Sequence, residues 1–392
     1  MPHYPYLIVG GGMTAAAAVQ GIRAIDRAGA IGVIGLEPHP PYQRPPLSKG
    51  LWKGMPLDSV GIDLAQQAVD LYLGRTAQML DPAQKQVIDD QGTRFSFDTL
   101  LLATGGTPRR FPWGGDDVIY YRTLDDYRRL RALTEHGQRF AVIGGGFIGS
   151  EIAAALAMNG KDVVMLFPAA GIGAHIFGPD LSTFLNTYYR QHGVEVRPGE
   201  TARGLARRAG KLALQTTSGH ELLVDGVVAG IGIEPNIALA QAAGLEVNNG
   251  IVVDAVLRTS HPDIYAAGDV ASFVNPALGT RLRVEHEDNA NTMGRQAGQN
   301  MAGERAPYEH LPFFYSDLFD LGYEAVGELD ARLEMVADWK DPFHEGVVYY
   351  LRDGRVRGVL LWNVWEQVDA ARRLIAAPGP FRAGDLLGRL PA

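Results

Sequence analysis

The stretch Tyr6-Leu7-Ile8-Val9-Gly10-Gly11-Gly12-Met13-Thr14-Ala15 decides the fold: an apolar run enters a glycine turn, and an alanine-rich stretch of helical composition, from Ala15 to Ile25, comes next. A second copy, Arg139-Phe140-Ala141-Val142-Ile143-Gly144-Gly145-Gly146-Phe147-Ile148-Gly149, lies about 130 residues later. Each copy predicts a strand, a tight turn and a helix. Glycines let the backbone approach a pyrophosphate, which binds at the N-terminus of the helix. The chain is therefore predicted to hold two dinucleotides.

Composition limits the remaining possibilities. A chain of 392 residues is too long for one compact core and suits two or three domains. The net charge of −8 argues against nucleic acid as a principal partner. No apolar run reaches the roughly 20 residues of a membrane span, and no signal-peptide pattern precedes Tyr6, so we expect a cytoplasmic protein. The arginine clusters 128–131 and 203–208 remain open as docking patches or as solvated faces.

The chain contains no cysteine. Thiol–disulfide exchange needs thiols, so electrons cannot pass through an internal disulfide. We predict no metal site.

Further segments extend the alternating pattern. We predict strands at 31–36, 87–90, 97–103 and 162–167, a helix at 151–159, and no regular structure in the proline-rich stretch 38–46. After about Leu311 the pattern becomes antiparallel: strands 345–351 and 355–362 flank the hairpin signal Asp353-Gly354, and a last helix spans 368–376. The predicted class is α/β with two Rossmann-like domains and an α+β C-terminal domain.

The two glycine turns differ in the residues that come after their second strand. Glu37 stands about 20 residues after the first turn and suits a ribose hydroxyl. The second copy has Pro168-Ala169-Ala170 there, with neither a carboxylate nor a cation. The missing cation is the stronger evidence of the two, because a 2′-phosphate without a positively charged partner costs more than a missing contact to a ribose hydroxyl. The sequence therefore favours NADH over NADPH.

Several other segments carry a resemblance to known proteins. They are 44–49, 103–109, 144–151, 232–236 and 266–269, which resemble FAD-dependent NADH reductases that feed ferredoxins and rubredoxins. The segments 284–288, 294–301, 314–318, 322–327, 350–353 and 361–363 more closely resemble the apoptosis-inducing factor family. The likeness covers nearly the whole chain.

The resemblance implies a glutathione-reductase-like architecture. It places a discontinuous FAD domain at 1–110 and 233–310, an inserted NADH domain at 111–232 and a C-terminal domain at 311–392. The residues implied to bind FAD are Gly10, Gly12, Ala15, Glu37, Arg44, Lys49, Ala77, Thr104, Gly105, Arg122 and Asp269. Those implied on the nicotinamide side are Gly144, Gly146, Phe147, Ile148, Gly149, Glu151, Gly232, Glu285, His286, Tyr315 and Glu324.

Four of these residues are the catalytic candidates: Lys49, Glu151, Tyr315 and His286. Hydride transfer needs a flat slot in which nicotinamide lies against flavin, and aromatic rings such as Phe147 and Tyr315 suit its walls. Lys49 suits the negative charge that reduction creates. The resemblance pairs it with Glu151, while Glu324 and His286 would orient the carboxamide.

Three departures from the family pattern are evident. Tyr315 stands where apoptosis-inducing factors carry tryptophan, and a phenol stacks less extensively than an indole. The long C-terminal insert of the animal proteins is absent before Gly346, and we expect no leader peptide. We expect an intact redox core without their import and insert-controlled regulation.

Several functions remain open at this point. The leading expectation is a FAD-dependent oxidoreductase that takes hydride from NADH and passes electrons to an external acceptor, whether quinone, oxygen, ferredoxin or rubredoxin. One form of it is the reductase component of a ferredoxin or rubredoxin chain. A slow NADH-sensing flavoprotein is the alternative, in which a charge-transfer complex controls dimerisation to a homodimer or partner binding. A purely structural nucleotide-binding protein would carry no flavin.

Overall fold

The computed structural model describes residues 1–391, and their backbone divides into two compact units. The first unit comprises Met1–Gln43, Asp58–Thr107 and Glu234–Phe313, and the second Arg44–Leu57, Pro108–Ile233 and Phe314–Ala392. The segment Arg44–Leu57, which the predicted boundaries place with residues 1–110, belongs to the second unit. The three-domain assignment itself stays a prediction.

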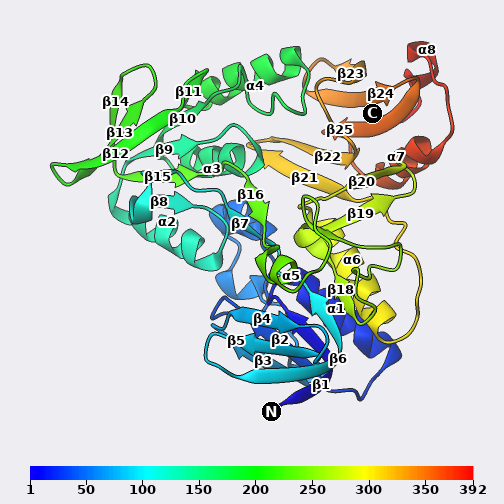
Figure 1. The fold of residues 1–392 in the computed structure, drawn as a ribbon. Helices are drawn as coiled ribbons and strands as arrows, with labels where there is room; N and C mark the ends of the chain where they lie inside the picture. The colour runs from blue at the N-terminus through cyan, green and yellow to red at the C-terminus, as the bar shows by residue number, and fades with distance from the viewer. Residues whose placement is uncertain (392) are drawn as a thin grey trace. The chain divides into compact units, whose positions relative to one another are not determined.

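The first unit is built on a seven-stranded sheet in the order β3-β2-β1-β6-β5-β4, with β18 beside β6 (Figure 1). Its strands are β1 (His3–Val9), β2 (Ile31–Gly35), β3 (Val69–Leu73), β4 (Ala77–Asp81), β5 (Gln86–Asp89), β6 (Arg94–Leu102) and β18 (Ile264–Ala266). The pairs β1–β2, β1–β6, β2–β3 and β6–β18 are parallel, which is the doubly wound pattern expected from the first glycine turn.

Two helices of this unit pack against each other through glycines. They are α1 (Met13–Ile25) and α6 (Glu287–Met301). A Cβ added at Gly294 would lie 2.4 Å from Thr14 O, and one at Gly298 would lie 2.1 Å from Ala18 O. The two backbones therefore approach more closely than side chains would permit. The remaining elements are α5 (Ala238–Ala242), β17 (Ile251–Val252), β19 (Ala271–Asn275) and β20 (Thr280–Leu282).

The second unit repeats the parallel architecture in a five-stranded sheet of order β11-β10-β9-β15-β8. Its elements are β8 (Val118–Tyr120), α2 (Leu124–His136), β9 (Arg139–Ile143), α3 (Phe147–Met158), β10 (Asp162–Phe167), α4 (Pro179–Gln191), β11 (Val194–Pro198) and β15 (Gly226–Ala229). An antiparallel sheet comes after β11, formed by β12 (Ala202–Arg208), β13 (Lys211–Thr216) and β14 (Glu221–Val224). β7 (Gly106–Pro108) and β16 (Ile233–Pro235) lie where the chain passes between the units.

The C-terminal part of this unit is an antiparallel sheet in the order β21-β22-β25-β24-β23. Its elements are β21 (Phe313–Leu318), β22 (Leu321–Gly327), β23 (Glu334–Asp341), β24 (Glu345–Arg352), β25 (Arg355–Trp362), α7 (Val368–Ala376) and α8 (Ala383–Leu386). Asp353 and Gly354 both take positive φ, +53° and +71°, as a tight hairpin turn requires. The predicted fold class is confirmed.

Two local predictions need correction. The helices after the glycine turns begin at Met13 and Phe147, not at Ala15 and Glu151, because Gly12 and Gly146 are themselves the extended residues that precede the first helical turn. The end of the proline-rich stretch is also regular: Pro45–Ser48 forms one turn of 3-10 helix. Proline is tolerated there because the first N–H groups of a helix need no internal partner.

Candidate active site

The first glycine turn forms an open cradle at the N-terminus of α1. A Cβ at Gly10 (φ +120°) would lie 2.0 Å from Ala103 O, so only glycine permits this close approach of the turn to the end of β6. A Cβ at Gly12 would meet nothing within 4 Å, and no side chain caps the helix there. Helix α1 thus begins beside open space, and an uncapped helix N-terminus of this kind fits the pyrophosphate of a dinucleotide.

Glu37 lies two residues beyond the end of β2, where a ribose anchor is expected. The Tyr42 hydroxyl donates to Glu37 Oε2 at 2.5 Å. Tyr42 was not predicted from the sequence, since a tyrosine within a proline-rich stretch has no spacing relation to the glycine turn. Its hydrogen bond fixes the carboxylate that would accept the ribose hydroxyls.

The second glycine turn has the same construction at α3. A Cβ at Gly149 would lie 2.1 Å from Gly144 O, whereas Gly146 has nothing within 4 Å and α3 has no side-chain cap. Gly232 takes φ +87° beside equally open space. These residues fit a second pyrophosphate. Phe147 packs edge-to-face against Phe314, with ring centroids 4.8 Å apart, and Ile148 is partly exposed.

Lys49 and Glu151 form a buried ion pair within the second unit. Lys49 Nζ lies 2.8 Å from Glu151 Oε1, and the two side chains are 12% and 2% exposed. The structure therefore brings together the two residues that the resemblance pairs. A buried charge is costly unless it is paired, so each of the two charges offsets the cost of burying the other.

Two serines that the sequence did not single out complete this site. Ser48 Oγ donates to Glu151 Oε2 at 2.5 Å, and Ser316 Oγ donates to Glu151 Oε1 at 2.6 Å. Both serines are buried. The carboxylate thus accepts a hydrogen bond from each serine and pairs with the Lys49 ammonium, so both of its oxygens have a partner.

The loop that carries Ser48 and Lys49 is anchored by aromatic side chains. The Leu47 carbonyl accepts from the Tyr121 hydroxyl at 2.5 Å and from Trp52 Nε1 at 2.8 Å. Trp52 also packs edge-to-face on Tyr127 of α2, at 5.6 Å between centroids. These contacts explain why the segment Arg44–Leu57 belongs to the second unit.

Tyr315 is the exposed aromatic residue of this site. Its side chain is 36% exposed on β21, and Lys49 Nζ lies 5.0 Å from its ring centroid. A ring that is partly exposed and rigidly held by a strand suits stacking with a planar ligand. The predicted stacking role stays a prediction.

Glu324 on β22 has an environment unlike that of Glu151. Burial raises the pKa of Glu324, an effect that Arg372 opposes and Glu366 reinforces. Within residues 1–391, Glu324 Oε2 has no hydrogen-bond partner although solvent does not reach it. An orphaned acceptor of this kind fits a donor from a ligand, such as the carboxamide NH₂ of nicotinamide.

Three more predicted site residues belong to the first unit and lie around the start of α6: Asp269, Glu285 and His286. Burial lowers the pKa of His286 to about 4, so its ring is neutral at pH 7. Arg283 Nη1 donates to the Asp269 carbonyl at 3.0 Å, and Nη2 lies 2.8 Å from Glu285 Oε1. Arg283, which the sequence did not single out, therefore joins two predicted cofactor-binding residues.

Other predicted FAD residues have backbone partners. Arg44 Nη1 donates to the Arg122 carbonyl at 3.0 Å, and Thr104 Oγ1 donates to the Asn236 carbonyl at 2.8 Å. Gly105 takes φ +62°, and Ala77 lies on β4. Ala77 also packs against the hydrophobic core of the first unit, and its predicted role in binding FAD stays a prediction.

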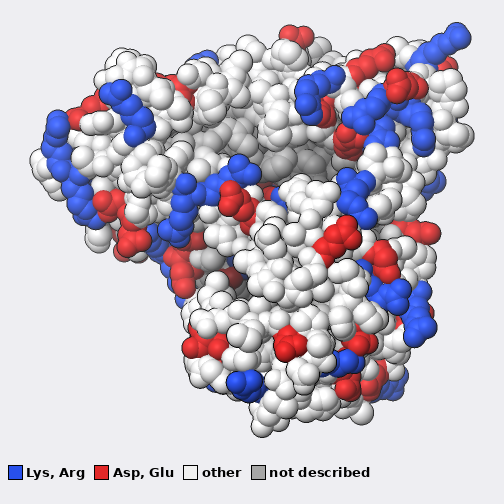
Figure 2. Space-filling view, viewed as in Figure 1, with Lys and Arg blue, Asp and Glu red and all other residues white. Residues whose placement is uncertain are grey.

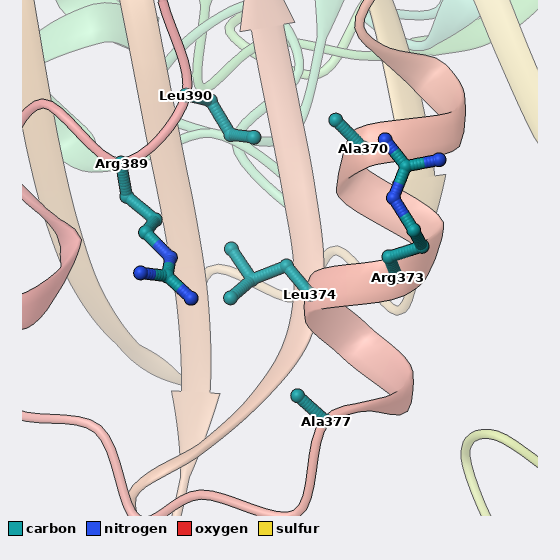
Figure 3. A pocket seen from close by; sticks show the side chains of 6 residues that line it. All are labelled: Ala370, Arg373, Leu374, Ala377, Arg389 and Leu390. Carbon is teal, nitrogen blue, oxygen red and sulfur yellow. The ribbon is translucent and has the colours of Figure 1, made fainter.

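Charged residues of both signs are interspersed on the face shown in Figure 2. In the cluster at 203–208, Arg207 pairs with Asp117 and Arg208 with Glu221. These pairs neutralise two of its positive charges. Figure 3 shows a pocket beside α7 that is lined by two arginines and by alanine and leucine side chains. Its lining residues are Ala370, Arg373, Leu374, Ala377, Arg389 and Leu390, none of them a predicted site residue.

Known proteins match this chain along almost all of its length. The family model for pyridine nucleotide-disulphide oxidoreductases matches residues 4–294. The model for the C-terminal region of apoptosis-inducing factor, mitochondrion-associated, matches 297–342 and 337–377. Among residues 1–391, no helix has the length and apolar character that a membrane crossing needs.

Individual known proteins also match almost the whole length of the chain. The ferredoxin–NAD(+) reductase component of an anthranilate 1,2-dioxygenase system from Burkholderia cepacia is 35% identical over 395 residues, covering 97% of each chain. Apoptosis-inducing factor 1 of Dictyostelium discoideum is 33% identical, covering 95% of this chain and 78% of its own. A chain in the crystal structure of a covalent putidaredoxin reductase–putidaredoxin complex superposes with a TM-score of 0.89 at 31% identity, covering 96% of this chain and 94% of its own.

The matches confirm the resemblance stated from the sequence. They also confirm an oxidoreductase that depends on FAD and NADH. Both glycine cradles fit the pyrophosphates of these two dinucleotides.

Proposed function

The chain belongs to the pyridine nucleotide-disulphide oxidoreductase family, and from this premise we propose that it is the reductase component of an electron-transfer chain. It takes hydride from NADH onto FAD and passes electrons to a ferredoxin-type iron–sulfur protein. The observation that carries this proposal is the 97% mutual coverage with a ferredoxin–NAD(+) reductase component. The superposition on the putidaredoxin reductase complex supports the same acceptor class.

The absence of cysteine gives the family chemistry a specific form here. Many oxidoreductases can pass reducing equivalents through a pair of thiols, but this chain contains none. The electrons therefore leave the bound flavin directly for the external acceptor. FAD supplies this chemistry when bound, because it accepts two electrons as hydride and releases them singly.

The residues of the chain have binding and electrostatic roles in this proposal. Gly12 and Gly146 leave open the helix N-termini that hold the two pyrophosphates. Tyr315 offers a flat surface to the nicotinamide, and Glu324 Oε2, which has no hydrogen-bond partner among residues 1–391, accepts from its carboxamide. Lys49, paired with Glu151, provides a positive charge 5.0 Å from the Tyr315 ring.

The proposal is tested by the stoichiometry of electron delivery. One NADH yields NAD⁺, one proton and two electrons, so it should reduce two molecules of a one-electron [2Fe–2S] ferredoxin. The FAD-loaded protein is mixed anaerobically with NADH and then with oxidised ferredoxin in a stopped-flow instrument. Rapid reoxidation of the flavin with two reduced ferredoxins per NADH supports the proposal. Reoxidation only by quinone, by oxygen or by the monodehydroascorbate radical rejects it.

A second function is favoured by the match of the C-terminal region to the apoptosis-inducing factor model. In it, NADH forms a long-lived charge-transfer complex that shifts the chain from monomer to homodimer. Light scattering with and without NADH distinguishes the two functions. A persistent long-wavelength band in air together with dimerisation supports this alternative, and rapid turnover by an unchanged monomer rejects it. A cytoplasmic location accords with either function and is testable by fractionation.

A further inference from the structure

The loop between β10 and α4 contacts the second glycine turn at two points. Gly173 N donates to the Gly145 carbonyl at 2.8 Å, and the His175 ring packs edge-to-face against Phe147 with centroids 5.8 Å apart. Gly145 and Phe147 stand on either side of Gly146, where a Cβ would meet nothing within 4 Å. All of these residues belong to the second unit. His175 therefore lies at the edge of the open cradle.

The His175 side chain is held in place but leaves its ring nitrogens available. The Ala331 N–H donates to the His175 carbonyl at 3.0 Å, which fixes the backbone of the loop. The side chain is exposed, and within residues 1–391 neither ring nitrogen has a hydrogen-bond or ion-pair partner. An imidazole always has at least one N–H donor, and it carries a positive charge when it is protonated. Both properties suit an anion.

The protein itself makes little use of a positive charge on His175. Loss of hydration against its neighbours lowers the pKa of His175, and the Asp330 carboxylate opposes this effect. Asp330 is already paired with a cation, because Arg332 Nε donates to its Oδ1 at 2.9 Å. The first turn of α3 carries no acidic side chain, and residues 168–170 carry no charge. A bound anion would therefore be the main partner of a protonated ring.

We propose that His175 is a pyrophosphate-binding residue of the NADH site: its imidazole donates to a phosphate oxygen held at the open N-terminus of α3. The helix supplies backbone donors there, but neither the turn 144–149 nor residues 168–170 contain a lysine or an arginine. A protonated imidazole adds a charge-assisted hydrogen bond to the doubly negative pyrophosphate. This inference rests on the part of the proposed function that concerns NADH, and it is independent of the electron acceptor.

Binding at this residue should be coupled to the uptake of a proton. The negative pyrophosphate stabilises the protonated ring, so the pKa of His175 should be higher in the complex than in the free protein. Affinity therefore rises as the pH falls from 8 to 6, because the complex takes up a proton that the free protein does not hold. The pyrophosphate keeps both of its charges in this range, so the ligand does not cause the change.

The test is the dissociation constant of ADP-ribose for the purified FAD-loaded protein, measured by isothermal titration calorimetry at pH 6 and pH 8. ADP-ribose keeps the pyrophosphate, lacks the nicotinamide and does not reduce the flavin. The wild type should bind it about fivefold more tightly at pH 6 than at pH 8. His175→Ala should weaken binding at pH 6 about tenfold. His136→Ala is the matched control: His136 is an exposed histidine in the last turn of α2, and its loss should leave both constants unchanged.

His175→Gln separates the charge of the ring from its hydrogen bond. A glutamine amide can donate but never becomes charged, so binding at pH 8 should stay within about twofold of the wild type while the gain at pH 6 disappears. Wild-type affinity of His175→Ala for ADP-ribose at both pH values overturns the inference. A loss of affinity that appears only with NADP⁺ also overturns it, because the ring would then contact the 2′-phosphate. A wild-type protein that reduces no ferredoxin refutes the proposed acceptor and leaves these constants unaffected.

Discussion

Lys49 Nζ and Glu151 Oε1 lie 2.8 Å apart with almost no exposure to solvent, and the pair joins the anchored loop to the first turns of α3. Salt should therefore weaken this pair far less than it weakens pairs on the surface. The same loop provides a surface pair for comparison: Lys53 lies 3.2 Å from Asp317, with exposures of 42% and 37%.

We predict that Glu151→Gln slows reduction of the bound flavin by NADH about 10- to 100-fold, or about 1.4–2.7 kcal/mol of barrier. The amide still accepts hydrogen bonds but no longer fixes the ammonium electrostatically. Stopped-flow absorbance measures the rate. Lys53→Ala, which breaks the exposed pair, should change the rate less than twofold and the free energy of unfolding by at most about 1 kcal/mol. Equal rates in Glu151→Gln and the wild type would contradict the role of the pair.

Tyr315 should control the contact with nicotinamide. Tyr315→Leu removes a stacking surface worth about 0.5–1.5 kcal/mol and should weaken NADH binding about 2- to 10-fold. Tyr315→Trp should strengthen the long-wavelength charge-transfer absorbance, because an indole stacks more extensively. Since the side chain is 36% exposed, the thermal midpoint should change little in either variant. An anaerobic titration with NADH checks both, and identical spectra in the three proteins would reject the assignment.

Substitutions at two glycines of the second turn should have separate effects on NADH binding and on the stability of the fold. Gly146→Ala places a Cβ in open space, so the free energy of unfolding should fall by no more than about 1 kcal/mol while NADH affinity drops, because the methyl occupies room needed by the pyrophosphate. Gly149→Ala places a Cβ 2.1 Å from Gly144 O and should cost about 1–3 kcal/mol of stability. Urea unfolding and NADH titration measure the two effects. Loss of stability in Gly146→Ala together with normal NADH binding would contradict the open cradle.

Because His286 is held neutral, we predict that the free energy of unfolding depends on pH in a specific way. Burial lowers the pKa of His286 to about 4, against an ordinary value of 6.5. Above pH 6.5 the ring is neutral in both states, so its full contribution is present. As the pH falls to 5, the unfolded chain takes up a proton that the folded chain largely does not, and stability falls by about 2 kcal/mol.

His286→Gln should remove that part of the decline. Urea unfolding at pH 7 and pH 5 measures the free energy of unfolding of both proteins, and the difference between them isolates the histidine from carboxylates that also titrate. An equal loss of stability in the variant and the wild type would show that His286 is not held neutral by the fold.

The buried strands were the part of the fold that the sequence predicted best. The predicted bounds of β9 and β10 coincide with the observed Arg139–Ile143 and Asp162–Phe167, because continuous apolar runs between turn residues leave few alternatives. Helix starts were missed by two to four residues, since the glycine before each helix resembles the rest of its turn.

The candidate site was predictable only where residue type and spacing carry a signal. The glycine turns and Glu37 have such a spacing, and the pairing of Lys49 with Glu151 was implied by resemblance. Ser48 and Ser316 were not predictable, because they lie 103 and 165 residues from Glu151 and a serine hydroxyl has no fixed spacing to a distant carboxylate.

The most direct test of the account is an anaerobic titration of the FAD-loaded protein with NADH. The chain has no cysteine, so FAD is expected to be its only two-electron centre. We predict that one equivalent of NADH per flavin bleaches the flavin absorbance completely. NADPH at the same concentration should reduce the flavin at least about tenfold more slowly, because residues 168–170 include no cation that could bind a 2′-phosphate. Bleaching that requires two equivalents of NADH, or that proceeds equally well with NADPH, would contradict this account.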